Sequence, residues 1–256
     1  MSVRVSREGV ITIITLDRPQ VRNAIDAPTA AALLAAFTEF EADKDARVGI
    51  LYGAGGTFCS GADLKALASG KDVPVLTELH GPLGPSRMLL SKPLIAAVAG
   101  YAVAGGLELA LLADIRVAER SAVFGVFNRR WGIPLIDGGT VRLPRIIGLA
   151  RALDMVLTGR KVSSDEALAM GLVNYVVDDG QALTASLELA RRISSFPQPA
   201  LLVDRRNCYG SSEELHVALR REFEQAVGVL KEPSVRELAI KFADGEGRHG
   251  EPLCLD

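Results

Sequence analysis

Along the first residues of the chain, apolar positions alternate with polar ones, which is the period of a β-strand. Val3 and Val5 stand before the turn-forming residues 7–9, and residues 10–14 are rich in isoleucine, so we predict a β-hairpin. Later apolar runs of strand length occur at 48–52, 94–98, 115–118 and 173–177. Polar or glycine-rich residues bound these runs, and we predict that each forms a strand.

Between these runs, apolar side chains recur every three to four residues, which is the period of an α-helix. Segment 29–44 carries Leu33, Phe37 and Phe40 at this spacing, with Thr29 as a candidate N-cap. Further helices are predicted at 62–68, 105–113, 140–146, 150–157, 165–170, 182–194, 200–208, 212–230 and 234–243. Segments 70–91 and 123–139 are rich in glycine and proline, which predicts irregular backbone.

The order of these elements predicts the fold class. Strands and helices alternate up to about residue 195, and only helices follow. Such alternation is typical of an α/β architecture with parallel strands, and the glycine-rich turns are compatible with a stacked or spiral arrangement. Pro197 and Pro199 interrupt the helical pattern, so we expect a core in residues 1–196 and a helical segment in residues 197–256.

Composition excludes several classes of function. The 256 residues include 29 Lys and Arg against 31 Asp and Glu, and this balance provides no basic surface for nucleic acid or an anionic membrane. The apolar stretch 93–113 contains Glu108 and three glycines, which favours a buried strand, turn and helix over a membrane span. The three cysteines are widely spaced and the three histidines form no ligand motif, so we expect no metal site and a reducing cytoplasm.

Two glycine-rich turns, at 55–65 and 100–108, each lead into a predicted helix. A helix start has unpaired backbone N–H groups and a partial positive charge, so two converging starts would stabilise an oxyanion. Small residues such as Ala62 and Gly105 would allow a substrate carbonyl to approach the backbone closely. The alternative is that both segments are ordinary turns that bind no ligand.

Glu108 lies among leucines, one turn inside its predicted helix. Burial of an unpaired carboxylate is unfavourable and raises its pKa, a combination found at functional sites. The alternative is a structural ion pair with Arg116, Arg129 or Arg130. Residues 53–58 have neither dinucleotide-binding nor P-loop spacing, and Ser60 is not in a nucleophile elbow, which argues against those enzyme classes.

Four motifs follow one another along the chain: FCSGADLK (58–65), KPLIAAVAGYAVAGGLELA (92–110), DIRVA (114–118) and GGT (138–140). Together they closely resemble the crotonase (enoyl-CoA hydratase/isomerase) superfamily. The resemblance implies a crotonase-like spiral of ββα units with a C-terminal helical oligomerisation segment. It also implies a homotrimer or a dimer of trimers.

The resemblance further implies that the substrate is an acyl thioester of coenzyme A, with no separate cofactor. Matched by position, the thioester oxygen would lie between the backbone N–H groups of Ala62 and Gly105. Ser60, Asp63 and Leu64 are the matching candidates for contacts with the coenzyme A moiety. Binding and catalysis would then belong to the core, and assembly to the helical segment.

Hydratases that resemble this chain use two glutamates, because adding water requires both a base and an acid. The first matches Glu108, whereas the second falls on Asn128, which cannot exchange a proton at neutral pH. Asp137 is a nearby carboxylate, and its alternative role is to cap the helix that follows. We therefore expect Glu108 and Asp137 to be catalytic, with Asn128 and Trp131 lining the pocket.

These expectations describe an acyl-CoA lyase of the enoyl-CoA hydratase kind that acts through a thioester enolate. Isomerisation of enoyl- or dienoyl-CoA, acyl-CoA hydrolysis, and binding without turnover remain alternatives. The observation that separates an enzyme from a binding protein is whether Glu108 and Asp137 share one cavity.

Overall fold

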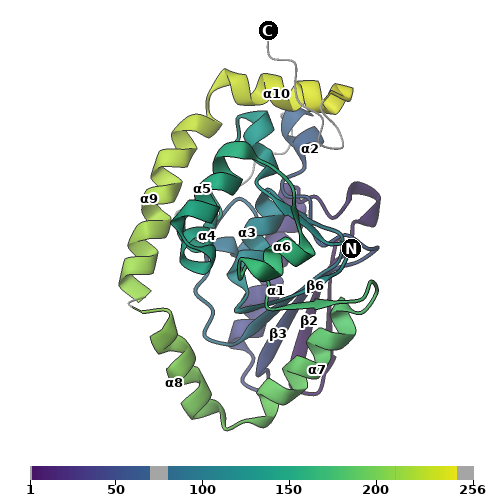
Figure 1. The fold of residues 1–256 in the computed structure, drawn as a ribbon, viewed down its shortest axis with the longest axis vertical. Coiled ribbons are helices and arrows are strands. Elements are labelled where there is room, and N and C mark those ends of the chain that lie inside the picture. Colours follow the sequence, from purple (N-terminus) through teal and green to yellow (C-terminus); the bar gives the residue numbers. More distant parts are fainter. Residues whose placement is uncertain (1, 70–79, 211, 247–256) are drawn as a thin grey trace.

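The computed structural model describes residues 2–69, 80–210 and 212–246, and Figure 1 shows their arrangement. Within these residues, the larger sheet has the strand order β1-β2-β3-β4-β6-β9. Its strands are β1 (Val3–Glu8), β2 (Ile11–Leu16), β3 (Val48–Gly53), β4 (Leu94–Val98), β6 (Ile115–Glu119) and β9 (Tyr175–Val177). Strands β1 and β2 form the predicted antiparallel hairpin, and every other pair in this sheet is parallel. The predicted α/β class is confirmed.

A second, smaller sheet was missed from the sequence. It contains β5 (Tyr101–Val103), β7 (Val123–Gly125) and β8 (Val162–Ser163), in the order β5-β7-β8. The expected loop 123–139 therefore begins as a strand and continues into the 3-10 helix η3 (Phe127–Trp131). Strands of two or three residues are too short to show a period of two, which is why the pattern did not predict them.

Helices cover both faces of the larger sheet. They are α1 (Ala27–Ala42), α2 (Leu64–Ser69), α3 (Gly105–Leu112), α4 (Gly139–Ile147), α5 (Leu149–Thr158), α6 (Ser164–Ala169), α7 (Ala182–Ser195), α8 (Gln198–Cys208), α9 (Ser212–Leu230) and α10 (Pro233–Asp244), besides the 3-10 helices η1 (Pro19–Val21) and η2 (Pro85–Arg87). On one face, Ile50 and Ile95 pack with the side chains of α7. On the other, Leu51 and Leu94 pack with α1 and α3. None of these described helices is both long and apolar enough to cross a membrane.

Several helix and strand boundaries differ from the prediction by one or two residues. Helix α1 begins at Ala27, and its N-cap is Asp26, whose carboxylate accepts the backbone N–H of Thr29 at 2.9 Å, so the assignment of Thr29 as the cap was wrong. An aspartate at this position satisfies a helix-start amide through the same geometry that a threonine would use. Helix α2 begins at Leu64, two residues after the expected start. Of the expected irregular segment 70–91, residues 70–79 lie outside the described residues.

The helices α8–α10 form an arm that passes around the core in Figure 1. Helix α9 packs on α4, and α10 packs on α2 and η3. The apolar face predicted for 212–230 is buried here through Leu215, Leu219 and Phe223. Trp131 of η3 meets Phe242 of α10 edge to face, with ring centroids 4.9 Å apart. The arm thus lies over the core of its own chain and places α10 against α2 and η3.

Candidate active site

The nine residues singled out from the sequence line one cavity of about 690 Å³, called the main cavity below. They are Ser60, Ala62, Asp63, Leu64, Gly105, Glu108, Asn128, Trp131 and Asp137. Residues of the arm, among them Val235 and Phe242, complete its wall. Glu108 and Asp137 therefore share one cavity, which is the arrangement that a two-carboxylate enzyme requires.

The two glycine turns meet at one side of the main cavity. Cys59 pairs with Ala102 in an isolated parallel bridge, which brings the turns together. A Cβ added to Gly61 would stand 2.9 Å from the backbone nitrogen of Gly105, so the two backbones are in direct contact. Gly61 has φ +92°, a conformation that glycine adopts without strain.

The backbone N–H groups of Ala62 and Gly105 donate no hydrogen bond to any part of the chain that the structure describes. Gly105 is the first residue of α3, where helix geometry leaves the amide without a partner in the helix. The preceding Ala104 has φ 53°, which is uncommon for a residue with a side chain and tends to occur at functional sites. Both residues line the main cavity, so their amides are candidate donors to a ligand oxygen.

Glu108 is buried, with only 3% of its surface exposed. Its Oε1 accepts the backbone N–H groups of Asp137 at 2.9 Å and of Gly139 at 2.8 Å. Burial raises the pKa of Glu108 well above the ordinary value, and the negative charges of Asp137 and Glu222 raise it further, against the effect of the two amides. This carboxyl is held in the protonated form more strongly than an ordinary glutamate.

The proposed ion pair between Glu108 and an arginine was wrong. The Arg116 guanidinium donates instead to the carbonyl oxygens of Leu172 and Ala113, and Arg130 stacks over the Phe127 ring. No arginine in the described residues forms a salt bridge with Glu108. The structure satisfies this carboxylate with backbone amides, a solution that the sequence pattern does not reveal.

Asp137 is also 3% exposed, and its Oδ1 accepts the hydroxyl of Ser86 and, at 3.2 Å, the backbone N–H of Leu83. Burial raises the pKa of Asp137 to about 6, although the hydrogen bonds from Ser86 and Leu83 lower it. The N-cap of α4 is Gly138, one residue after Asp137, and it has no side chain with which to cap the helix. The carboxylate of Asp137 faces Ser86 and Leu83, so the helix-cap alternative was wrong.

The sequence matches the family described as enoyl-CoA hydratase/isomerase over residues 6–232. The chain belongs to the enoyl-CoA hydratase/isomerase family. It is 44% identical to "Enoyl-CoA hydratase EchA19" of Mycobacterium tuberculosis over 198 residues, which cover 75% of this chain and 74% of the relative. It is 40% identical to the carnitinyl-CoA dehydratase of Salmonella paratyphi A over 237 residues, or 91% and 90% of the two chains.

Solved structures of this family share the fold of the chain. A carnitinyl-CoA hydratase from Mycobacterium avium superposes with a TM-score of 0.87 at 34% identity and covers 95% of both chains. An enoyl-CoA hydratase from Mycobacterium tuberculosis superposes with a TM-score of 0.77 at 37% identity and covers 95% of this chain and 96% of its own. The crotonase-like fold predicted from the motifs is confirmed.

Within this family member, the position expected for a second glutamate is occupied by a buried asparagine. The Nδ2 of Asn128 donates to the carbonyl of Ile133 at 2.8 Å. Its Oδ1 is buried and has no hydrogen-bond partner in the described residues. A buried acceptor without a partner is unfavourable, and Asn128 lines the main cavity.

Several residues of the site were not identified from the sequence. Ser86 and Leu83, which hold Asp137, lie more than fifty residues before it. Glu222 of α9 is 7% exposed and accepts amides at the start of α4. The sequence pattern could have indicated Glu222, because it shares one helix face with Leu215, Leu219 and Ala226. A carboxylate is unexpected on an otherwise apolar face. No comparable sequence pattern indicates that Ser86 belongs to the site.

Proposed function

We propose that this chain is an acyl-CoA lyase of the enoyl-CoA hydratase kind, which adds water to, or removes it from, the bond next to a thioester. The observation that carries the proposal is the pair of buried carboxylates, Glu108 and Asp137, in one cavity with the two available amides of Ala62 and Gly105. Membership of the enoyl-CoA hydratase/isomerase family supports it independently.

The amides of Ala62 and Gly105 are proposed to donate hydrogen bonds to the thioester oxygen. Charge builds on that oxygen when water attacks Cβ, and two fixed donors stabilise the resulting enolate. Neither donor has a competing partner in the described chain, so binding the oxygen breaks no existing hydrogen bond.

The two carboxyl groups are proposed to divide the proton transfers. Asp137, whose pKa is raised only to about 6, is ionised at neutral pH, whereas the pKa of Glu108 is raised further by burial and by its acidic neighbours. In hydration, Asp137 takes a proton from water as the oxygen joins Cβ, and Glu108 gives its proton to Cα as the enolate collapses. The two groups exchange roles in the reverse direction, as pairs with separated pKa values do.

Contacts with the coenzyme A moiety are proposed for Ser60, Asp63 and Leu64, which belong to the first glycine turn and line the main cavity. The side chains of Arg22, Lys65, Arg130 and Lys231 also line the main cavity and supply positive charge for phosphate groups. Asn128 is proposed to accept a hydrogen bond from the substrate or from water, and Trp131 to form the wall against the acyl chain.

A second candidate function is double-bond isomerisation, because Asn128 stands where the second glutamate of a hydratase is expected and isomerases also move protons with carboxylates. The deciding experiment offers enoyl-, dienoyl-, 3-hydroxyacyl- and saturated acyl-CoA thioesters to the purified protein. Gain or loss of one water by mass supports the proposal. A change in absorbance without a change in mass indicates isomerisation, release of free coenzyme A indicates hydrolysis, and no reaction with tight binding overturns an enzymatic role.

Assembly as a homotrimer or a dimer of trimers is proposed from the family resemblance, and a location in the reducing cytoplasm is proposed from the wide spacing of the three cysteines. Support for assembly comes from an exposed apolar stripe on α5, where Leu149 and Leu157 are 64% and 71% exposed and Leu153 lies between them. Such a stripe on one helix face fits contact with another copy of the chain. Light scattering at micromolar concentration tests this, and a monomer would contradict it.

A further inference from the structure

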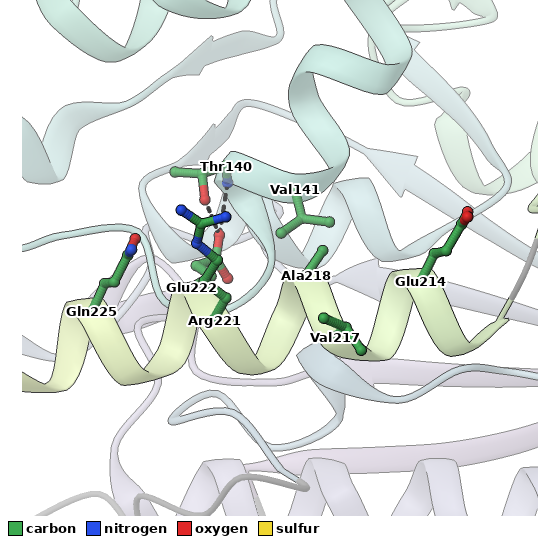
Figure 2. A pocket seen from close by; sticks show the side chains of 8 residues that line it. All are labelled: Thr140, Val141, Glu214, Val217, Ala218, Arg221, Glu222 and Gln225. Carbon is green, nitrogen blue, oxygen red and sulfur yellow. Dashed lines mark hydrogen bonds between the residues drawn. The ribbon is translucent and has the colours of Figure 1, made fainter.

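Glu222 lies on the buried face of α9, on the opposite side of the α4 start from Glu108. Its carboxylate accepts the backbone N–H of Gly138 at 2.7 Å and that of Thr140 at 2.8 Å, together with the hydroxyl of Thr140. Figure 2 shows Glu222 reaching from α9 to Thr140, beside a second cavity of about 620 Å³ between α4 and α9. The proposed chemistry does not use Glu222 directly.

Residues 137–140, called the clamped turn below, have four consecutive backbone amides that alternate between two carboxylates. The N–H groups of Asp137 and Gly139 donate to Glu108, whereas those of Gly138 and Thr140 donate to Glu222. The clamped turn also contains Asp137 itself, so one short segment orients both carboxyl groups of the proposed acid–base pair.

The clamped turn has little room to adjust. A Cβ at Gly139 would stand 2.8 Å from Glu108 Oε1, and one at Gly138 would stand 2.2 Å from the Arg142 guanidinium. Gly138 has φ +95°, which glycine tolerates and other residues do not. Arg142 further fastens the turn by donating to the carbonyl oxygens of Asp137 and Ser86.

We propose that Glu222 is a positioning residue of the active site: by binding alternate amides of the clamped turn, it aims the other amides at Glu108 and fixes Asp137 in the main cavity. This inference rests on the proposed function, because it assigns a role toward the acid–base pair. A carboxylate of the C-terminal arm then contributes to catalysis without entering the main cavity.

The charge of Glu222 adds a second, separable effect. Besides Glu108 and Asp137 themselves, the charged groups near this pair are Arg87 of η2, Arg142 of α4 and Glu222 of α9. The thiol of Cys59 also lies nearby. The negative charge of Glu222 raises the pKa of both Glu108 and Asp137, so removing that charge lowers both. A purely structural contact would not move a pH profile in this way.

Three variants separate geometry from charge. Glu222→Gln removes the charge and, because the side-chain NH2 group cannot accept a hydrogen bond, also removes one of the two backbone contacts. Glu222→Asp keeps the charge but is one methylene shorter, so it cannot reach both amides. Glu224→Gln is the matched control, because Glu224 is an exposed glutamate on the same helix.

We expect kcat to fall by about tenfold to a hundredfold in both Glu222 variants with KM nearly unchanged, because small misplacements of reacting groups have effects of this size. The acid limb of the kcat/KM profile should move to lower pH in Glu222→Gln and stay in Glu222→Asp. Glu224→Gln should match the unmodified protein. A Glu222→Gln protein that matches the control, or that loses only thermal stability with an unmoved pH profile, overturns the inference.

Two further measurements complete the test. If Glu222→Gln does not fold, Thr140→Val takes its place, since it removes only the hydroxyl donor to Glu222; a severalfold loss of kcat supports the inference, and full kcat overturns it. Glu108→Gln assayed in parallel distinguishes a failure of the proposed function from a failure of the role assigned to Glu222. An active Glu108→Gln protein overturns the proposed function itself, whereas an inactive one beside an unaffected Glu222→Gln overturns only the role of Glu222.

Discussion

The glycine-turn side of the main cavity and its carboxylate side differ in how they are assembled. On the first side, Ala62 and Gly105 come from two backbone turns joined by a short bridge, and no side chain is needed to present their amides. On the second side, Glu108 and Asp137 depend on Leu83 and Ser86, from one other part of the chain, and on Glu222, from another.

This difference separates two kinds of chemical task. A hydrogen-bond donor for an oxyanion has to be held rigidly in place, which two adjoining turns provide locally. A proton-transferring pair needs separated pKa values, and these depend on burial and on neighbouring charges. Tertiary contacts therefore determine the carboxylate side, and single side-chain changes should affect it in graded ways, whereas the glycine-turn side should respond only to changes in the backbone.

The largest effect is expected from Glu108→Gln, on the carboxylate side. The variant keeps the shape of the side chain and can still accept the amides of Asp137 and Gly139, but it cannot transfer a proton. We expect turnover to fall by about 10³, within the usual range for a general acid or base. Steady-state kinetics with an enoyl-CoA substrate measures the loss, and isothermal calorimetry should show that affinity for the thioester remains. Unchanged turnover would remove Glu108 from the chemistry.

The glycine-turn side is tested by removing the Gly105 amide. A proline or alanine at 105 is a poor probe, because a Cβ there would stand 2.3 Å from Leu83 Cδ1. Replacing Gly105 with glycolic acid converts the backbone amide to an ester, which removes the N–H group and adds no side-chain atom. We expect a loss of about 10² to 10³ in kcat, as for other oxyanion-hole donors. An ester variant of full activity would contradict the proposed hole.

Asp137→Asn is expected to lower turnover by about 10², since general-base contributions begin at that size. The substitution keeps the side-chain volume and a hydrogen bond to Ser86, so the fold should be preserved. Asp63 provides a comparison, because its carboxylate lines the same cavity but is bound to Arg18. We expect Asp137→Asn to lose more turnover than Asp63→Asn. Equal and small effects at both positions would show that Asp137 is not the partner of Glu108.

The same contrast explains what could be predicted from the sequence. The long strands and helices were predicted because each shows an apolar run or a helical period over five or more residues, as β3 and α9 respectively do. Strands β5 and β8 contain three and two residues and were missed, and β7 was taken for loop. The turns at Ala62 and Gly105 could be found because their residue types are consecutive in the sequence.

The carboxylate side could be predicted only in part. Glu108 was marked by its leucine neighbours, but its partners are backbone amides more than twenty-five residues away, which no pattern of side chains reveals. The contact between Ser86 and Asp137 is equally remote. Electrostatic coupling depends on distances in the folded chain, and these arise only when α4, α9 and η2 pack together.

The smallest expected effect is a shift in pH dependence from Ser86→Ala. The Ser86 hydroxyl donates to Asp137 and so stabilises the ionised carboxylate, which lowers the pKa of Asp137 against the effect of burial. Because the proposed base acts as the carboxylate, activity should be lost as the pH falls through about 6 in the unmodified protein. Without the hydroxyl the pKa of Asp137 rises, so the acid limb of kcat/KM should move to higher pH while the rate well above that limb stays within a fewfold. Ser195→Ala, which changes an exposed serine at the end of α7, serves as the control. An acid limb that stays in place, or moves to lower pH, would mean that a group other than Asp137 accepts the proton.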